Sequence, residues 1–137
     1  MHLLRSLLLP LGVAAVVLVA WTSMPIRPGM TVTMGIHYSH FTPAAITVPT
    51  GVPITFVLSN DDPIDHEWIV GDEATHTRHR LGTEPHHGQR PTEQSIAALS
   101  TVRATVTFPA PGTYRYICHL PGHEAYGMVG VVTVTGA

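Results

Sequence analysis

Apolar and polar residues alternate along several segments of this chain, and a period of two is typical of β-strands that bury one face. The apolar positions are Val32, Met34, Ile36 and Tyr38, then Ile54, Phe56 and Leu58, then Val102, Ala104, Val106 and Phe108, and finally Tyr114, Tyr116 and Cys118. Turn-forming residues separate these segments at 49–51, 60–63 and 109–112. The spacing predicts an all-β fold, an antiparallel β-sandwich of seven to eight short strands.

One segment departs from this alternation. Residues 71–94 are polar, lack apolar periodicity and contain His76, His79, His86 and His87. We expect a long loop, and a loop of this length in a compact domain usually has a function or is mobile. Two interpretations of the histidines stay open: side chains exposed to solvent, or an auxiliary metal site or pH-sensitive cover close to the main site.

The N-terminal segment also differs from the rest of the chain. Residues 7–21 carry no charge and follow Arg5, which is the pattern of an export segment. We interpret residues 1–29 as a signal anchor or signal peptide, folded as a hydrophobic helix, with a short linker. Trp21 stands where a cleavage site needs small residues, which favours a retained membrane anchor. Either outcome places residues 30–137, a single domain, outside the cytoplasm, as a secreted, periplasmic or membrane-anchored protein.

Charge and cysteine content exclude several classes of function. Seven basic and nine acidic side chains give a formal net charge of −2, so nothing indicates binding to nucleic acid or to an anionic membrane surface. Cys118 is the single cysteine of the chain, which rules out an internal disulfide and any metal centre that needs two thiolates.

The most informative motif surrounds that cysteine. Cys118, His123 and Met128 follow one another at five-residue intervals, in a loop between the predicted strands 112–117 and 128–134. A thiolate, a thioether and an imidazole, completed by a second imidazole, are the ligands of a blue-copper electron-transfer site. His66 follows the turn at 60–65 and opens a buried apolar run, so we expect it to supply the second imidazole. His119 should point to the opposite side of the strand from Cys118 and not bind this metal.

The Cys-x₄-His-x₄-Met loop resembles that of the cupredoxins, the type 1 blue copper proteins. Its spacing is most similar to that of rusticyanin and sulfocyanin. The resemblance extends over residues 30–137 and includes the runs 41–49 and 56–60, Gly51 and His66. It implies a cupredoxin-like Greek-key β-sandwich that binds one copper ion, Cu(I) or Cu(II). Carried over residue by residue, it implies that His66, Cys118 and His123 are equatorial ligands and that Met128 is axial.

One position departs from the family pattern. Glu67 follows the first histidine ligand, where many members have Asn or Ser, and in the family the backbone N–H of this residue bonds the cysteine sulfur. Any residue except proline retains that donor, so we expect the bond to persist here.

These features lead to an expected function. We expect a monomeric one-electron carrier, not an enzyme, because the chain is too short for a catalytic metal site with an open position besides the copper site. Its partner would be a redox protein, such as a membrane oxidase or another copper protein. The alternative is an extracytoplasmic protein of copper binding or trafficking, assisted by the histidine-rich segment. The two differ in whether the copper is retained or released.

Overall fold

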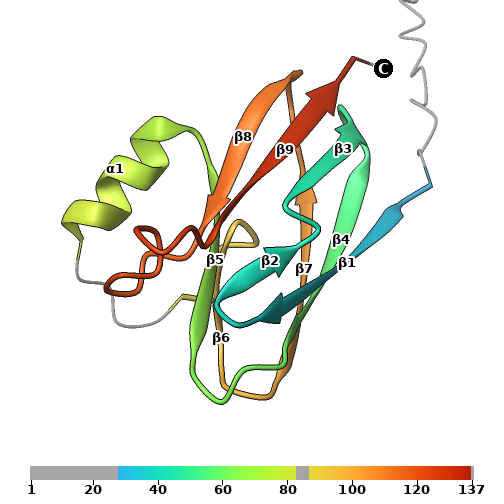
Figure 1. The fold of residues 1–137 in the computed structure, drawn as a ribbon. Coiled ribbons are helices and arrows are strands. Elements are labelled where there is room, and N and C mark those ends of the chain that lie inside the picture. Colours follow the sequence, from blue (N-terminus) through green and yellow to red (C-terminus); the bar gives the residue numbers. More distant parts are fainter. Residues whose placement is uncertain (1–27, 83–86, 137) are drawn as a thin grey trace, which may run out of the picture.

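The chain folds into two β-sheets packed face to face, with one short helix beside them (Figure 1). The computed structural model describes residues 28–82 and 87–136. The elements, in chain order, are β1 (Met30–His37), β2 (His40–Thr42), β3 (Ala45–Pro49), β4 (Pro53–Asn60), β5 (His66–Gly71), α1 (Glu73–Leu81), β6 (Glu93–Ile96), β7 (Thr101–Thr107), β8 (Gly112–Ile117) and β9 (Val129–Thr135). The predicted N-terminal hydrophobic helix and His86 lie outside the described residues.

The core lies between the two sheets and is built from the alternating apolar positions. In β4, Ile54, Phe56 and Leu58 are fully buried, whereas the residues between them are only partly covered. The Phe56 ring of one sheet meets the Trp68 ring of the other, with centroids 4.8 Å apart. The period of two therefore identified the inward faces correctly, and the predicted all-β sandwich is confirmed.

The strand pairing differs from the antiparallel arrangement that we expected. One sheet has the order β2-β1-β4-β7 and the other the order β3-β9-β8-β5-β6. The pairs β1–β4 and β3–β9 are parallel. The chain passes from one sheet to the other between β2 and β3 and again between β3 and β4, and such crossovers allow parallel neighbours. Nine strands are present among the described residues, where seven to eight were predicted. The prediction fell short because β2 and β6 are too short for a periodicity to show.

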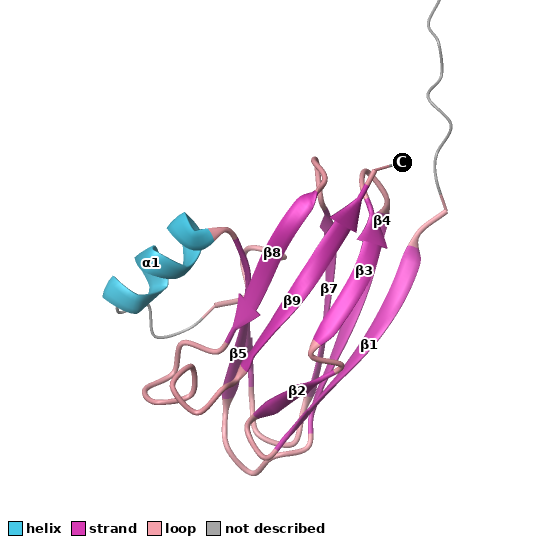
Figure 2. Cartoon of the chain, turned by 45° about the horizontal axis from the view of Figure 1, so that its top comes forward, coloured by secondary structure: helices cyan, strands magenta, loops and turns pink. Residues whose placement is uncertain are grey.

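Helix α1 corrects the expectation of a long loop at residues 71–94. Asp72 caps its N-terminus by accepting a hydrogen bond of 2.9 Å from the Thr75 N–H. Glu73 in the first turn and basic residues in the last turn suit the helix dipole. Only His76 of this helix is buried, so the segment has no apolar stripe that a periodicity search would detect. Figure 2 shows α1 outside the sandwich, on the side of β5 and β8.

The described part of the chain contains no helix long and apolar enough to span a bilayer.

Candidate metal centre

The loop from Cys118 to Met128 leaves the end of β8 and returns into β9 (Figure 1). Backbone hydrogen bonds close it: the Cys118 N–H donates to the Met128 carbonyl over 3.2 Å, and the Met128 N–H donates to the His123 carbonyl over 3.0 Å. Gly122 and Gly127 have backbone φ angles of 85° and 92°, which residues other than glycine rarely adopt. The loop is thus a tightly hydrogen-bonded turn that holds its three predicted ligands close to each other.

Three of the four predicted ligands bring one donor atom each to the same point. The Nδ1 atoms of His66 and His123 lie 3.2 Å apart, and the Cys118 Sγ lies 3.3 Å from the His123 Nδ1. All three donor atoms lie within 4.8 Å of one another. His66 and Cys118 are almost completely buried, whereas His123 is partly exposed. The structure therefore joins residues that are 57 positions apart in the sequence.

The donor atoms fit a copper ion. Two nitrogens that share an ion at bond lengths of about 2.0 Å lie no more than about 4 Å apart, and the observed 3.2 Å meets this limit. Burial raises the pKa of the Cys118 thiol to about 11, so this sulfur becomes a thiolate at neutral pH only with a cation beside it. Burial, and then the electrostatic effect of the neighbouring His66, lower the pKa of His123, which favours the neutral imidazole that binds metals.

Met128 lies next to these residues. Its side chain is fully buried and belongs to the same core cluster as Cys118. Its backbone bonds both other predicted ligands of the loop, as described above. Its role as the axial ligand stays a prediction.

Comparison with known proteins agrees with this geometry. The model of the family described as copper binding proteins, plastocyanin/azurin family, matches residues 29–135. The chain belongs to that family. The chain is thus a cupredoxin. Members of this family bind copper and carry electrons rather than act as enzymes, in line with the expectation from the ligand loop. The similarity of the loop spacing to rusticyanin and sulfocyanin is not tested by these matches.

Three similar proteins give this cupredoxin a closer context. It is 34% identical over 98 residues to the copper-resistant cuproprotein CopI of Rubrivivax gelatinosus, covering 69% of this chain and 59% of CopI. It is 34% identical over 110 residues to auracyanin-B of Chloroflexus aurantiacus, covering 69% of this chain and 47% of auracyanin-B. The crystal structure of dithionite-reduced auracyanin from Roseiflexus castenholzii superposes with a TM-score of 0.67 at 26% identity, covering 80% of this chain and 99% of that one. The chain thus spans less than two thirds of the length of the first two relatives.

A carboxylate that the sequence analysis missed holds the first histidine of this cupredoxin. The Asp62 Oδ2 atom lies 2.9 Å from the His66 Nε2 atom, on the opposite side of the ring from the Nδ1 that faces His123. Asp62 also accepts hydrogen bonds from the backbone N–H groups of Tyr38 (2.7 Å) and Ser39 (2.8 Å). Burial alone would raise the pKa of Asp62, but these two donors and His66 lower it below its usual value. The ring of His66 is therefore fixed by an ionised carboxylate.

The hydrogen bond expected between the residue after the first histidine ligand and the cysteine sulfur is present. The Glu67 N–H donates to the Cys118 Sγ over 3.3 Å, as we expected from a backbone donor that any residue except proline provides. Burial raises the pKa of the Glu67 carboxyl. His119 points away from the donor cluster and meets His76, with 3.0 Å between His119 Nε2 and His76 Nδ1, as the alternation of the strand predicted.

The described histidines of the polar segment are not exposed. His76 is fully buried, and the side chains of His79 and His87 are 5% and 4% exposed. The expectation of a solvated loop is therefore wrong for these three residues. His76 and His79 belong to α1, which packs against β5, and His79 and His87 both lie near Glu93 at the start of β6.

Proposed function

We propose that this cupredoxin binds one copper ion through His66, Cys118, His123 and Met128 and transfers single electrons. The observation that carries the proposal is the convergence of two imidazole nitrogens and one buried sulfur within 4.8 Å. Two nitrogens and a thiolate with a thioether nearby form the ligand set of blue-copper sites. The auracyanin of R. castenholzii, whose crystal structure is that of a dithionite-reduced protein, supports a redox role for this fold.

The residues of the chain would keep the ligands in place during the redox cycle. When bound, a copper ion supplies the one-electron couple between Cu(II) and Cu(I). Asp62 orients His66, the Glu67 N–H holds the Cys118 sulfur, and the loop hydrogen bonds hold His123. Ligands that are held by hydrogen bonds from neighbouring residues move little when the charge of the copper ion changes. The energy needed to rearrange the site during electron transfer is therefore low.

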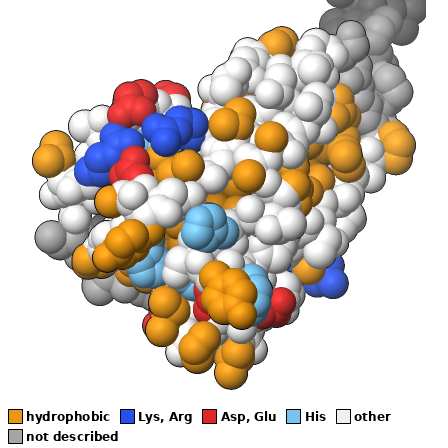
Figure 3. Space-filling view, in the orientation of Figure 1, with side chains coloured by type: hydrophobic (Ala, Val, Ile, Leu, Met, Phe, Trp, Pro, Cys, Tyr) orange, Lys and Arg blue, Asp and Glu red, His pale blue; other side chains and the backbone are white. Residues whose placement is uncertain are grey.

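The exposed side of the loop suits a transient contact with a redox partner protein. Tyr126 is 76% exposed, Pro121 is exposed and Leu120 is partly exposed, all close in sequence to the partly exposed His123. Figure 3 shows apolar atoms around histidine atoms on one face of the molecule. A small apolar patch favours quick release of a partner such as a membrane oxidase or another copper protein. We propose that the protein acts as a monomer.

Voltammetry of the copper-loaded protein tests electron transfer. We expect a reversible one-electron wave and one copper ion per chain after many cycles, and no wave from the Cys118→Ser variant. Loss of the metal during cycling, or a wave that the variant retains, would contradict electron transfer through this site.

Copper binding and delivery is the second candidate function. It is favoured by the buried His79 and His87, the second of which pairs with Glu67 beside the ligand His66, and by the 34% identity to a protein named a copper-resistant cuproprotein. In that case the copper ion would leave the protein readily. Incubation of the loaded protein with a chelator of moderate affinity separates the two functions: retained copper supports the electron carrier, and rapid loss supports delivery.

We also propose that residues 1–29 direct the domain of residues 30–137 out of the cytoplasm and keep it at the membrane. The uncharged run of residues 7–21 behind Arg5, and Trp21 at the place where cleavage would require small residues, support this. Mass spectrometry of the protein from the membrane fraction tests it. An intact N-terminus supports the anchor, and a soluble protein shortened by about 20 to 30 residues would show a cleaved signal peptide instead.

A further inference from the structure

A second group of metal-ligating side chains lies on the side of the sheet covered by α1. It consists of His79 from α1, His87 from the segment before β6, and Glu93 at the start of β6. The Glu93 Oε2 atom lies 3.7 Å from the His79 Nε2 and 3.9 Å from the His87 Nδ1. The three donor atoms lie within 4.8 Å of one another, and each of the three side chains is at most 7% exposed.

His79 is held in the orientation of a metal ligand. Its Nδ1–H donates to the Thr75 carbonyl over 2.9 Å, which leaves the lone pair on Nε2. The Nε2 atom is buried and has no hydrogen-bond partner among residues 28–82 and 87–136. A histidine with one nitrogen bonded to a backbone carbonyl and the other unoccupied is typical of metal sites. A buried nitrogen without a partner is costly, and a bound cation would remove that cost.

Glu93 divides its two oxygens between different partners. Its Oε1 accepts hydrogen bonds from Arg78 (2.6 Å) and Arg90 (3.1 Å), whereas its Oε2 faces the two imidazoles. Burial alone would raise the pKa of Glu93, but the two arginines and His79 lower it, so the carboxylate is ionised at neutral pH. A carboxylate oriented by hydrogen bonds on one oxygen and open on the other is a common arrangement around bound metals.

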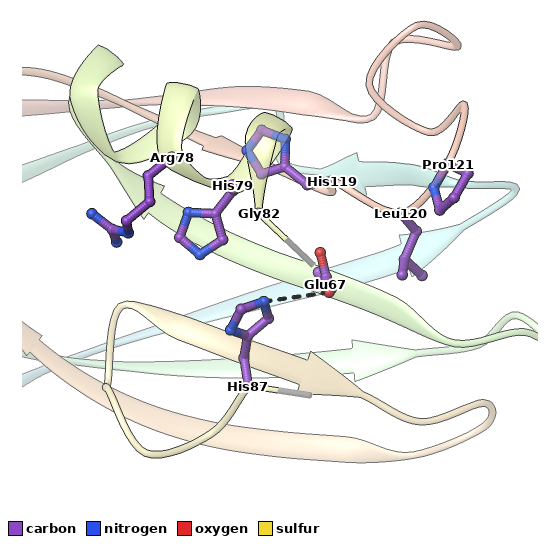
Figure 4. A pocket seen from close by; sticks show the side chains of 8 residues that line it. All are labelled: Glu67, Arg78, His79, Gly82, His87, His119, Leu120 and Pro121. Carbon is purple, nitrogen blue, oxygen red and sulfur yellow. Dashed lines mark ion pairs between the residues drawn. The ribbon is translucent and has the colours of Figure 1, made fainter. Parts of the chain in front are cut away.

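A cavity of about 320 Å³ opens beside this group and provides a route for an ion. Its lining includes Glu67, His79, His87, His119 and Leu120. Figure 4 shows the rings of His79 and His87 on opposite sides of this space, with the Glu67 carboxylate at one end joined to His87 by an ion pair.

We propose that His79, His87 and Glu93 bind one divalent transition-metal ion, Zn²⁺ or Cu²⁺, at a site separate from the copper ligands of the loop. Two imidazoles and one carboxylate suit borderline ions of this class. The set contains no sulfur for Cu(I) and too few oxygens for Mg²⁺ or Ca²⁺. Three protein ligands leave one position for water or a further ligand on the side of the cavity.

The two sites are connected through Glu67. Its Oε1 lies 3.5 Å from the His87 Nε2, and its backbone N–H donates to the Cys118 Sγ. An ion bound by His87 would therefore act on the cysteine ligand through a single residue, and it should change the absorption of the copper–thiolate bond slightly without removing it.

Zinc titration of the protein already loaded with one equivalent of copper tests the proposal. Bound zinc is measured by elemental analysis after desalting and by calorimetry, while the visible copper band reports that the first site and the fold stay intact. We expect the parent to bind one equivalent of zinc. The variants His79→Gln and Glu93→Gln should each bind zinc with an affinity lower by about tenfold or more. The matched control is His40→Gln, an exposed histidine at the edge of the other sheet, which should bind zinc as the parent does.

Two results would overturn the proposal. One is a copper-loaded parent that takes up no zinc. The other is zinc binding that His79→Gln and Glu93→Gln leave unchanged, which would identify adventitious binding elsewhere or a purely structural ion-pair cluster. If Glu93→Gln fails to fold, His79→Gln decides, because it removes the unpartnered nitrogen without disturbing the two arginine contacts.

Discussion

The Asp62 carboxylate contacts the His66 Nε2 at 2.9 Å, and the opposite nitrogen of the same ring faces His123. Asp62 lies four residues before His66 and is itself fixed by Asn60, whose Oδ1 accepts the Asp62 N–H over 3.0 Å. The turn between β4 and β5 therefore sets both the position and the tautomer of the first copper ligand.

Replacing Asp62 by Asn should weaken copper binding. The variant keeps the shape of the side chain but removes the charge that orients and polarises His66, and losses of this kind lower metal affinity by about 10- to 100-fold. Competition with a chelator of known affinity measures the change. The control is Asp61→Asn, which alters the exposed neighbouring carboxylate. Equal affinities in Asp62→Asn and the parent would show that the carboxylate contact does not support the ligand.

Replacing Glu67 by Gln should leave the thiolate-to-copper absorption band almost unchanged. The group that touches the Cys118 sulfur is the backbone N–H of Glu67, which the substitution retains. Visible spectra of the copper-loaded parent and variant give the comparison, with Cys118→Ser as the variant that should lose the band. A colourless Glu67→Gln protein of native fold would mean that the carboxylate is itself required at the copper site.

Replacing Gly130 by Ala should destabilise the sandwich. Gly130 in β9 pairs with Tyr116 in β8, and a Cβ atom at Gly130 would overlap the fully buried Tyr116 ring. Overpacking of this kind costs about 1–3 kcal/mol in the free energy of unfolding. Urea denaturation measures it against Gly136→Ala, where the new Cβ meets no atom within 4 Å. Equal midpoints for the two variants would contradict the close approach of Tyr116 to β9.

The cap of α1 should depend on pH. Hydrogen bonds from the Thr75 N–H and hydroxyl lower the pKa of Asp72, so the carboxylate stabilises the helix above the ordinary aspartate value of about 3.9. This contribution is lost as the pH falls through the lower pKa of the folded state. The Thr75 amide signal in NMR spectra should therefore titrate with a midpoint below 3.9. A midpoint at or above that value would contradict the cap, and Asp72→Asn should abolish the titration.

Much of the fold could be predicted because its signals are local. Ile54, Phe56 and Leu58 alternate with partly exposed residues, and Cys118, His123 and Met128 belong to one short loop. The parallel pairing of β1 with β4 could not be predicted from the sequence, because it depends on where the chain crosses between the sheets. Helix α1 was not predicted because its residues are polar on nearly every side. Its stability comes from the Asp72 cap and from contacts with distant residues, such as the ion pair of Arg80 with Glu124.

The copper ligands were easier to predict than the residues that support them. A turn followed by a buried run pointed to His66, but nothing in the spacing marked Asp62 as its partner, because short acidic turns are common without such a role. The group of His79, His87 and Glu93 depends on α1 bringing His79 back over β6, so a histidine-rich composition alone could suggest a metal site but not its members.

Reconstitution with Cu²⁺ tests the central claim, the gathering of His66, Cys118, His123 and Met128 around one copper ion. Visible and electron spin resonance spectra are recorded for the parent, for Cys118→Ser and for His66→Ala. We expect an intense thiolate-to-copper band in the parent, its absence in Cys118→Ser and an altered spin resonance signal in His66→Ala. A parent protein that stays colourless with one equivalent of copper bound, or a band that persists without Cys118, would contradict the account.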